Sequence, residues 1–200
     1  MARRGGICLT LLVLALHGCG TSERSVEWIG EVDDKLLSRI TDDINAAQRD
    51  NILLLHASIT SMGGTVWDGL AIASRVRGAS DGGLTVEITA RGYCASACTF
   101  ILAAGTPGHR LAAPDAFILV HAPWSDGPFG IHQCVTRPDV LATLEDKHAA
   151  LVLDSVVKAY IRYTGASTSD VEAWLKCDTE HSGFGGEAVE LHLADRVAAQ

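Results

Sequence analysis

The chain has 200 residues, of which 48% are hydrophobic and 20% are charged, and its formal net charge is −8. This balance is typical of one globular domain with a full hydrophobic core. An acidic surface repels phosphate backbones and anionic headgroups, so we expect no nucleic-acid partner.

The amino-terminal segment predicts an export signal. Arg3 and Arg4 provide a positive start, and residues 7–16 form an apolar stretch. Because this stretch is too short to span a bilayer, it is typical of a signal peptide and not of a membrane anchor. We therefore expect residues 1–18 to be removed from the mature protein, which would lie in the bacterial cell envelope on the periplasmic side.

A cysteine directly follows the predicted signal. Gly18 precedes Cys19, as a small residue precedes the lipid-bearing cysteine of a bacterial lipobox. We expect a lipid on Cys19 to anchor the protein to a membrane, with residues 19–25 as a lipidated tether. His17 is unusual for a lipobox, and the alternative is an ordinary secretory signal with an incidental cysteine.

Cysteine usage agrees with export. Beyond the amino-terminal segment there are four cysteines: Cys94, Cys98, Cys134 and Cys177. An even number in an oxidising compartment predicts up to two disulfides, with three full pairings open. Zinc is the alternative, but the Cys94–Cys98 spacing is not the tight C-x2-C knuckle and no H-x3-H partner follows. We expect no metal and no other cofactor.

After the tether, apolar patterns alternate between strand and helix. Strands are predicted at 26–32, 51–59, 84–90 and 117–124, and helices at 33–48, 66–78, 97–105, 138–163 and 168–177. The run at 51–59 is continuously apolar, which predicts a strand buried on both faces. Strand–helix alternation predicts a single α/β domain over residues 26–200 with a mostly parallel sheet.

Several residues that could take part in catalysis or binding directly follow the predicted strands. In parallel sheets, ligands bind at these strand ends. Gly63 and Gly64 let the backbone approach a ligand closely. Ser96 begins a predicted helix, and His121 ends a strand 25 residues later. A neutral imidazole is the commonest base that activates a serine. Taken singly, each residue has a structural alternative: a turn, a helix cap, or a core histidine.

The order of the motifs narrows these alternatives. The segments are "ITSMGGTVWDGLAI", "GYCASACTFILAAG", "AFILVHAP" and "EAVELHLAD". They resemble the Clp protease proteolytic-subunit-like serine peptidases of the ClpP/crotonase fold. The resemblance implies a spiral of repeated β-β-α units. It also implies Ser96 as nucleophile, His121 as general base, and the N–H groups of Gly64 and Ala97 as the oxyanion hole.

The resemblance leaves the acid that orients His121 open. Counting forward from Gly165 reaches Asp178, whereas counting back from the "EAVE" segment reaches Glu180. We prefer Asp178, because Glu172 continues the preceding helix in register with the family. Either carboxylate could hold the imidazole tautomer.

The resulting hypothesis is a cell-envelope serine hydrolase, an ATP-independent peptidase that acts through a Ser-His-Asp triad and an acyl-enzyme. Its partners would be a peptide or protein substrate and the membrane, and the resemblance allows a homo-oligomer. One alternative is a non-catalytic envelope binding or scaffold protein that keeps the fold. Another is a crotonase-type acyl-CoA enzyme, which fits export poorly because acyl-CoA is cytosolic.

Overall fold

The computed structural model describes residues 22–126, 132–135 and 144–199. The predicted signal peptide, the lipidation site Cys19 and the first residues of the tether lie outside this part of the chain. The same holds for residues 127–131 and 136–143, and thus for the first residues of the helix predicted at 138–163.

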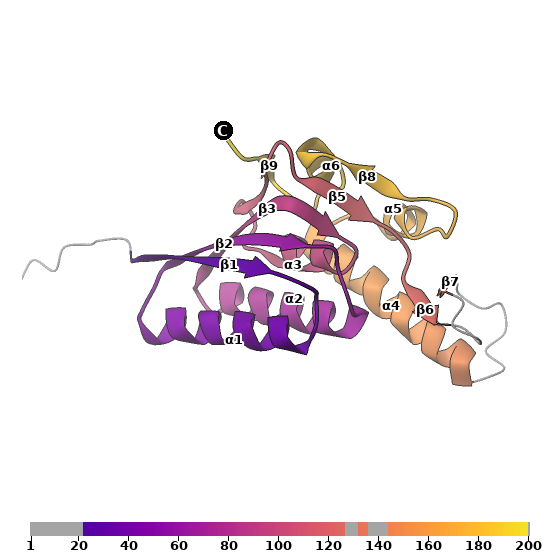
Figure 1. The fold of residues 1–200 in the computed structure, drawn as a ribbon, viewed down its shortest axis with the longest axis horizontal. Coiled ribbons are helices and arrows are strands. Elements are labelled where there is room, and N and C mark those ends of the chain that lie inside the picture. Colours follow the sequence, from indigo (N-terminus) through magenta and orange to yellow (C-terminus); the bar gives the residue numbers. More distant parts are fainter. Residues whose placement is uncertain (1–21, 127–131, 136–143, 200) are drawn as a thin grey trace, which may run out of the picture.

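The fold is an α/β domain built on a seven-stranded, mostly parallel sheet (Figure 1). One path through the sheet runs β1 (Glu23–Ile29), β2 (Leu54–Ser61), β3 (Thr85–Ala95), β4 (Arg110–Ala112) and β9 (Arg196–Val197). The end of β3 pairs instead with β5 (Phe117–Val120), and β5 pairs with the antiparallel β8 (His181–Gly183). A separate hairpin joins β6 (Trp124–Asp126) and β7 (His132–Cys134). The predicted ClpP-type fold class is confirmed.

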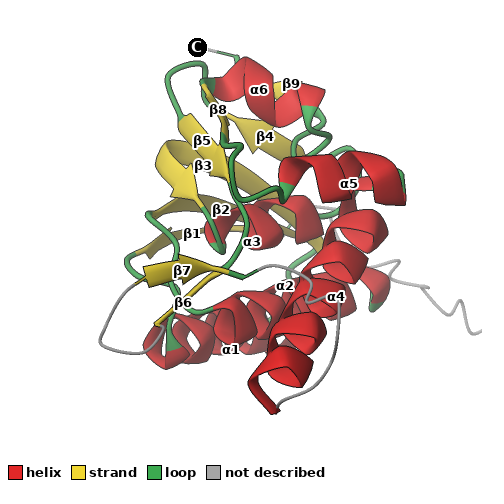
Figure 2. Ribbon diagram, turned by 90° about the vertical axis from the view of Figure 1, so that its right-hand side faces the viewer, coloured by secondary structure: helices red, strands yellow, loops and turns green. Residues whose placement is uncertain are grey.

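Helices cover one face of the long strands. Those on that face are α1 (Asp34–Arg49), α2 (Val66–Asp81) and α3 (Cys98–Ala104) (Figure 1). The remaining helices are α4 (Leu144–Thr164), α5 (Thr168–Trp174) and α6 (Gly185–Glu190); α5 packs beside α4 (Figure 2). Within the described residues, no helix combines the length and the apolar character needed to cross a bilayer.

One prediction about the sheet is wrong. Residues of β2 alternate between buried and half-buried positions, so helices cover only one face of this strand and not both. His56 lies on the uncovered face, with Nδ1 2.8 Å from a Glu87 carboxylate oxygen and Nε2 3.3 Å from Glu23. Burial would lower the pKa of His56, but these two carboxylates outweigh it and raise the pKa above its ordinary value.

An ion pair fastens the C-terminal segment to the sheet. Arg110 of β4 is 8% exposed and donates through its guanidinium to both carboxylate oxygens of Asp195. The same carboxylate accepts from the backbone N–H groups of Gly108 and Arg110, at 2.8 and 2.9 Å. Burial by itself would raise the pKa of Asp195, but the hydrogen bonds from Arg110 outweigh it and hold the pKa below its ordinary value.

This ion pair predicts how stability depends on pH. Because the pKa of Asp195 is lower in the folded state, its stabilisation is present above the unfolded pKa of about 4 and is lost as the pH falls further. Asp195→Asn leaves Arg110 buried without its partner, so we expect a loss of about 2–4 kcal/mol in the free energy of unfolding at pH 7. Urea unfolding should show the difference from wild type shrinking between pH 4 and pH 2.

The matched control is the exposed Asp115. Asp115→Asn should change the free energy of unfolding by less than about 0.5 kcal/mol at either pH. Equal losses in the two variants would contradict the role assigned to Asp195.

Candidate active site

Ser96 occupies a sharp elbow between β3 and α3. Its φ is +54°, a left-handed conformation that residues with a side chain adopt rarely. The Ser96 N–H donates to the carbonyl of Leu119 on β5 at 2.8 Å. The Ser96 carbonyl accepts from both the N–H and the hydroxyl of Thr99, at 3.0 and 2.6 Å. The surroundings therefore hold Ser96 in a conformation that is unfavourable by itself, a feature that concentrates at functional sites.

The hydroxyl of Ser96 does not cap α3. This helix begins at Cys98, its N-cap residue is Ala97, and no side chain makes the cap hydrogen bond. A capping serine would accept from a backbone N–H two or three residues further along the chain. The structure therefore contradicts the alternative that Ser96 serves only as a helix cap.

A buried hydrogen-bond chain supports the elbow from α4. Because the Thr99 hydroxyl donates to Ser96, the Tyr160 hydroxyl, 2.6 Å away, must donate to Thr99. Thr99 is fully buried and Tyr160 is 2% exposed, and burial raises the pKa of Tyr160 far above its ordinary value. Tyr160 thus keeps its proton in any neutral buffer. The sequence contained no local signal for this support, since 61 residues separate the two side chains.

Of the two glycines after β2, Gly63 packs against this elbow and Gly64 packs against Val32. A methyl group on Gly63 would stand 2.7 Å from the Cβ of Ser96, and one on Gly64 would stand 2.2 Å from the carbonyl oxygen of Val32. Their φ angles are +97° and +155°. Only glycine allows this approach, because both the space and the backbone conformation exclude a side chain.

Two backbone N–H groups beside Ser96 are available to a ligand. Among the described residues, the N–H groups of Gly64 and Ala97 donate to no other backbone group and to no side chain. Gly63 also brings Ala97 close, since a methyl group on Gly63 would lie 3.3 Å from the Ala97 nitrogen. Amide N–H groups close to a serine can stabilise the negative charge that develops on a carbonyl oxygen under attack.

His121 follows β5 directly. The parallel pairing of Ala95 with Leu119 means that Ser96 and His121 leave the ends of neighbouring strands. Both residues are half-buried. In the described part of the chain, however, no hydrogen bond joins the Ser96 hydroxyl to the imidazole. Catalytic hydrogen bonds are often long in unliganded enzymes and tighten when substrate binds.

The imidazole of His121 has two competing partners at Nδ1. This nitrogen lies 2.6 Å from the carbonyl oxygen of Ala122 and 3.1 Å from the indole nitrogen of Trp124. One nitrogen cannot serve both, because the carbonyl requires a proton on Nδ1 and the indole N–H requires a lone pair there. A proton on Nδ1, donated to Ala122, leaves Nε2 free to act as a base. Trp124, which is 51% exposed, therefore contacts the catalytic candidate His121 and affects its tautomer.

Both candidate acids are exposed, and their segments are connected to the segment of His121 in two different ways. The antiparallel pair Val120–His181 puts Glu180 one step beyond the ladder, on the side of His121. Asp178 follows Cys177, which is cross-linked to Cys134 opposite Trp124. Neither carboxylate is hydrogen-bonded to His121 among the residues the structure describes.

The four cysteines form two disulfides. Of the pairings left open by the sequence, the structure contains Cys94–Cys98 and Cys134–Cys177. The first closes around Ser96, and the second ties the hairpin after His121 to the segment with the candidate acids. Elsewhere in the described ranges, no three His, Cys, Asp or Glu side chains are grouped closely enough to hold a metal ion.

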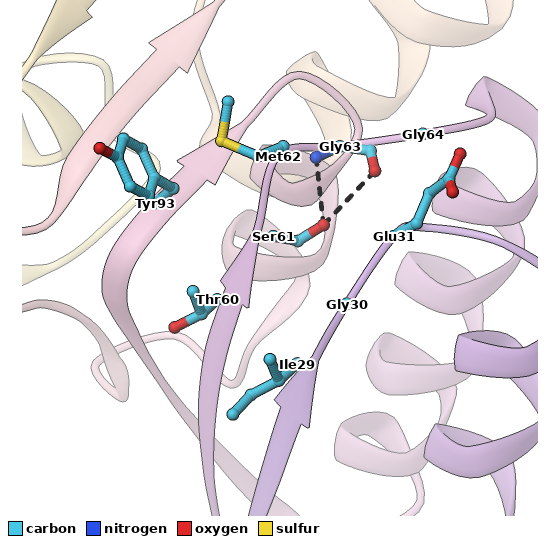
Figure 3. A pocket seen from close by; sticks show the side chains of 9 residues that line it. All are labelled: Ile29, Gly30, Glu31, Thr60, Ser61, Met62, Gly63, Gly64 and Tyr93. Atoms are coloured by element: carbon cyan, nitrogen blue, oxygen red, sulfur yellow. Dashed lines mark hydrogen bonds between the residues drawn. The ribbon is translucent and has the colours of Figure 1, made fainter.

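A hollow of about 550 Å³ opens beside the glycine pair (Figure 3). Its exposed apolar side chains are Ile29, Met62 and Tyr93, which are 54%, 66% and 52% exposed. Gly63 and Gly64 line the same hollow. Ser96 and His121 do not line the hollow, but Gly63 borders it and packs close to Ser96. The hollow thus offers apolar surface to a bound chain beside the elbow.

A serine at a strand–helix elbow, with a glycine packed against it and a histidine directly after the neighbouring parallel strand, defines a ClpP-type α/β protein. The Clp protease family model matches residues 20–200, and the chain belongs to this family. The resemblance detected in the sequence motifs is thereby confirmed at the level of the family.

Three relatives illustrate the similarity. The chain is 34% identical over 186 residues to the ATP-dependent Clp protease proteolytic subunit of Pleurastrum terricola, covering 92% of this chain and 88% of that one. It is 30% identical over 152 residues to subunit 2 of Prochlorococcus marinus, covering 75% and 69%. The match to subunit 3 of Streptomyces avermitilis is 36% identical over 92 residues, which span 46% of this chain and only 41% of that subunit.

Proposed function

We propose that this protein is a serine peptidase of the bacterial cell envelope that acts through an acyl-enzyme on Ser96. The observation that carries the proposal is the left-handed elbow at Ser96, packed against Gly63. The N–H groups of Gly64 and Ala97 next to it have no hydrogen-bond partner among the residues that the structure describes. A helix cap would need none of these features, whereas a nucleophile needs its hydroxyl held beside oxyanion donors.

In the proposed reaction, Nε2 of His121 accepts the proton of Ser96 while Oγ attacks the peptide carbonyl carbon. The carbonyl oxygen becomes an oxyanion, which the N–H groups of Gly64 and Ala97 stabilise. His121 then gives its proton to the leaving amine as the C–N bond breaks. A water molecule, deprotonated by His121, hydrolyses the serine ester and restores the hydroxyl. No metal or organic cofactor takes part.

The substrate is proposed to be a peptide or an unfolded protein segment with apolar side chains. The hollow beside the glycine pair supports this, because its exposed side chains Ile29, Met62 and Tyr93 suit apolar groups. The relatives are named ATP-dependent. For this chain we propose ATP-independent hydrolysis, since an exported enzyme has no access to cytosolic ATP. A homo-oligomer is part of the proposal by analogy with the family.

The direct test uses a fluorophosphonate probe on the full, oxidised chain. Mass spectrometry should find a single adduct on Ser96, and His121→Ala should slow labelling by about 10³-fold or more because the base is lost. The matched control is His192→Asn, an exposed histidine with φ +55° at the far end of α6, where asparagine tolerates the backbone. It should label like wild type.

Absence of any adduct on folded, correctly oxidised protein over a broad pH range would contradict the peptidase proposal. That result would favour the envelope binding or scaffold protein. An adduct on a different serine would be consistent with a serine hydrolase but would contradict the assignment of Ser96 as its nucleophile.

The orienting acid can be identified by amide substitutions. We propose Asp178 for this role, supported by its tether through Cys177 to the hairpin beside His121, with Glu180 as the alternative. Conversion of the true acid to its amide should lower kcat by about 10⁴-fold, because the wrong imidazole tautomer is then stabilised. Asp178→Asn and Glu180→Gln are therefore measured side by side in the same peptide assay, and each serves as the other's control. Equal, small effects would mean that the Ala122 carbonyl alone orients His121.

The envelope location is proposed from the amino-terminal segment. Cys19→Ser should abolish membrane association, and the protein should run as precursor or as a soluble form in fractionated cells. Mature-sized protein that stays with the membranes would contradict lipidation at Cys19 while leaving the peptidase assignment untouched.

A further inference from the structure

The disulfide Cys94–Cys98 surrounds the residue on which the proposed function depends. Ser96 is the central residue of the cross-linked segment, and Ala97, whose N–H is a proposed oxyanion donor, lies within it. Cys94 is held in the sheet by pairing with Ser61 of β2 and Ile118 of β5. Cys98 is the first residue of α3. The cross-link therefore connects the last fixed part of the strand to the first turn of the helix.

The cross-link restricts the elbow strongly. The Cα atoms of Cys94 and Cys98 are 5.2 Å apart, whereas four residues of continuing strand would separate them by about 13 Å. A strand that continued from Cys94 through Ser96 to Cys98 is therefore excluded, and the chain must turn within this segment. The turn that the structure contains has Ser96 at φ +54°, close to Gly63.

We propose, building on the peptidase function above, that Cys94–Cys98 is a positioning disulfide that holds Ser96 and Ala97 in reacting geometry. Neither cysteine acts as a catalytic residue, because neither contacts the reacting atoms in the proposed reaction. A displacement of about 1 Å at a reacting group can cost about 100-fold in rate, so loss of the cross-link should appear mainly in kcat.

A purely stabilising role fits this disulfide poorly. In the chain-entropy account, stabilisation grows with the length of the closed loop. Cys94–Cys98 spans a sequence separation of 4 and Cys134–Cys177 one of 43. The longer loop is thus the better general stabiliser, whereas the shorter one acts on a single turn of backbone, at the proposed nucleophile.

A redox switch is also disfavoured by burial. Reduction requires a thiolate to reach a sulfur atom and form a mixed disulfide, after which a second thiol releases the oxidised reductant and two protein thiols. Cys94 and Cys98 are both 0% exposed, whereas Cys177 is exposed and Cys134 half-buried. A dithiol should therefore open Cys134–Cys177 in the folded protein long before Cys94–Cys98.

The experiment compares the full chain with Cys94→Ala/Cys98→Ala. We expect kcat for a peptide substrate, and the limiting rate of fluorophosphonate labelling, to fall by about 100-fold. KM and the midpoints of the pH–rate profile should stay unchanged, because the substrate hollow and His121 are untouched. The matched control is Ile44→Val, a buried change in α1 that lowers Tm without touching the elbow. It should leave kcat unchanged at the assay temperature.

Hydrogen exchange separates this inference from the proposed function. The N–H groups of Ser96 and Thr99 are hydrogen-bonded across the elbow, and both should exchange faster in the double variant than in Ile44→Val. If the wild-type protein neither reacts with the fluorophosphonate probe nor hydrolyses peptides, the peptidase proposal fails. The exchange rates alone then test whether the disulfide positions Ser96 and Ala97. Unchanged exchange with unchanged kcat would overturn the inference. So would alkylation of Cys94 and Cys98 before Cys134 and Cys177 under mild dithiol treatment, which would indicate a switch.

Discussion

Ser96→Ala should abolish peptide hydrolysis and leave the fold unchanged. Loss of a serine nucleophile typically lowers kcat by about 10⁴–10⁶-fold, with only oxyanion and binding effects remaining. Stability should hardly change, because the Ser96 hydroxyl makes no cap hydrogen bond; a lost cap would cost about 1 kcal/mol. The measurements are a steady-state peptide assay and thermal unfolding of the same preparation.

Ser96→Gly provides the matched comparison. Glycine adopts the left-handed conformation without strain, so this variant should be as stable as wild type or more stable by up to about 1 kcal/mol, and equally inactive. Such a result would show that the sequence retains a strained serine at a cost to stability, as functional sites do. Residual hydrolysis in both variants would place the nucleophile elsewhere. A clear loss of stability in both would assign Ser96 a structural role.

Gly64→Ala should damage both stability and activity. The new methyl group would stand 2.2 Å from the Val32 carbonyl oxygen, which accepts a hydrogen bond from Thr65. The turn must then move, which breaks its bonds to Val32 and turns the Gly64 N–H away from Ser96. We expect a loss of about 2–4 kcal/mol in the free energy of unfolding. Peptide hydrolysis should fall by about 10²–10³-fold, the usual effect of one lost oxyanion donor.

Gly186→Ala is the control for this variant. A methyl group at Gly186, in α6, meets no atom within 4 Å, so it should be neutral or stabilise by up to about 1 kcal/mol. If Gly64→Ala is destabilised but has the kcat of wild type, Gly64 packs against Val32 as described but its N–H is not an oxyanion donor. Wild-type stability would contradict the packing argument itself.

Local patterns in the sequence were sufficient for the helices up to α5 and for the order of the site, whereas α6 was not predicted. An aspartate before the first helix caps α1, where the Asp33 carboxylate accepts from the N–H of Leu36 at 2.8 Å. Helical periodicity and cap chemistry depend on neighbours within a few residues, so they can be read directly from the chain. The glycine pair and the serine segment were recognisable for the same reason, because each is a short segment of consecutive residues that requires a particular backbone conformation.

Other features depended on residues far apart in the chain. The exposure of His56 depends on which face of β2 the helices cover, and the composition of the strand does not contain that information. The pairing of Cys134 with Cys177 depends on the path of the chain between them. The support of Ser96 by Tyr160 likewise requires α4 to pack against α3.

The sequence by itself determined the α/β class, the family and the identity of the candidate nucleophile and base, because these are written in short motifs and in their order. Only the tertiary structure decided that Ser96 is a strained elbow and not a cap, and that a buried disulfide surrounds it. The physical reason is that a hydrogen bond or a cross-link forms where atoms meet in space. For Ser96, those atoms come from the turn after β2, from β5 and, through Thr99, from α4.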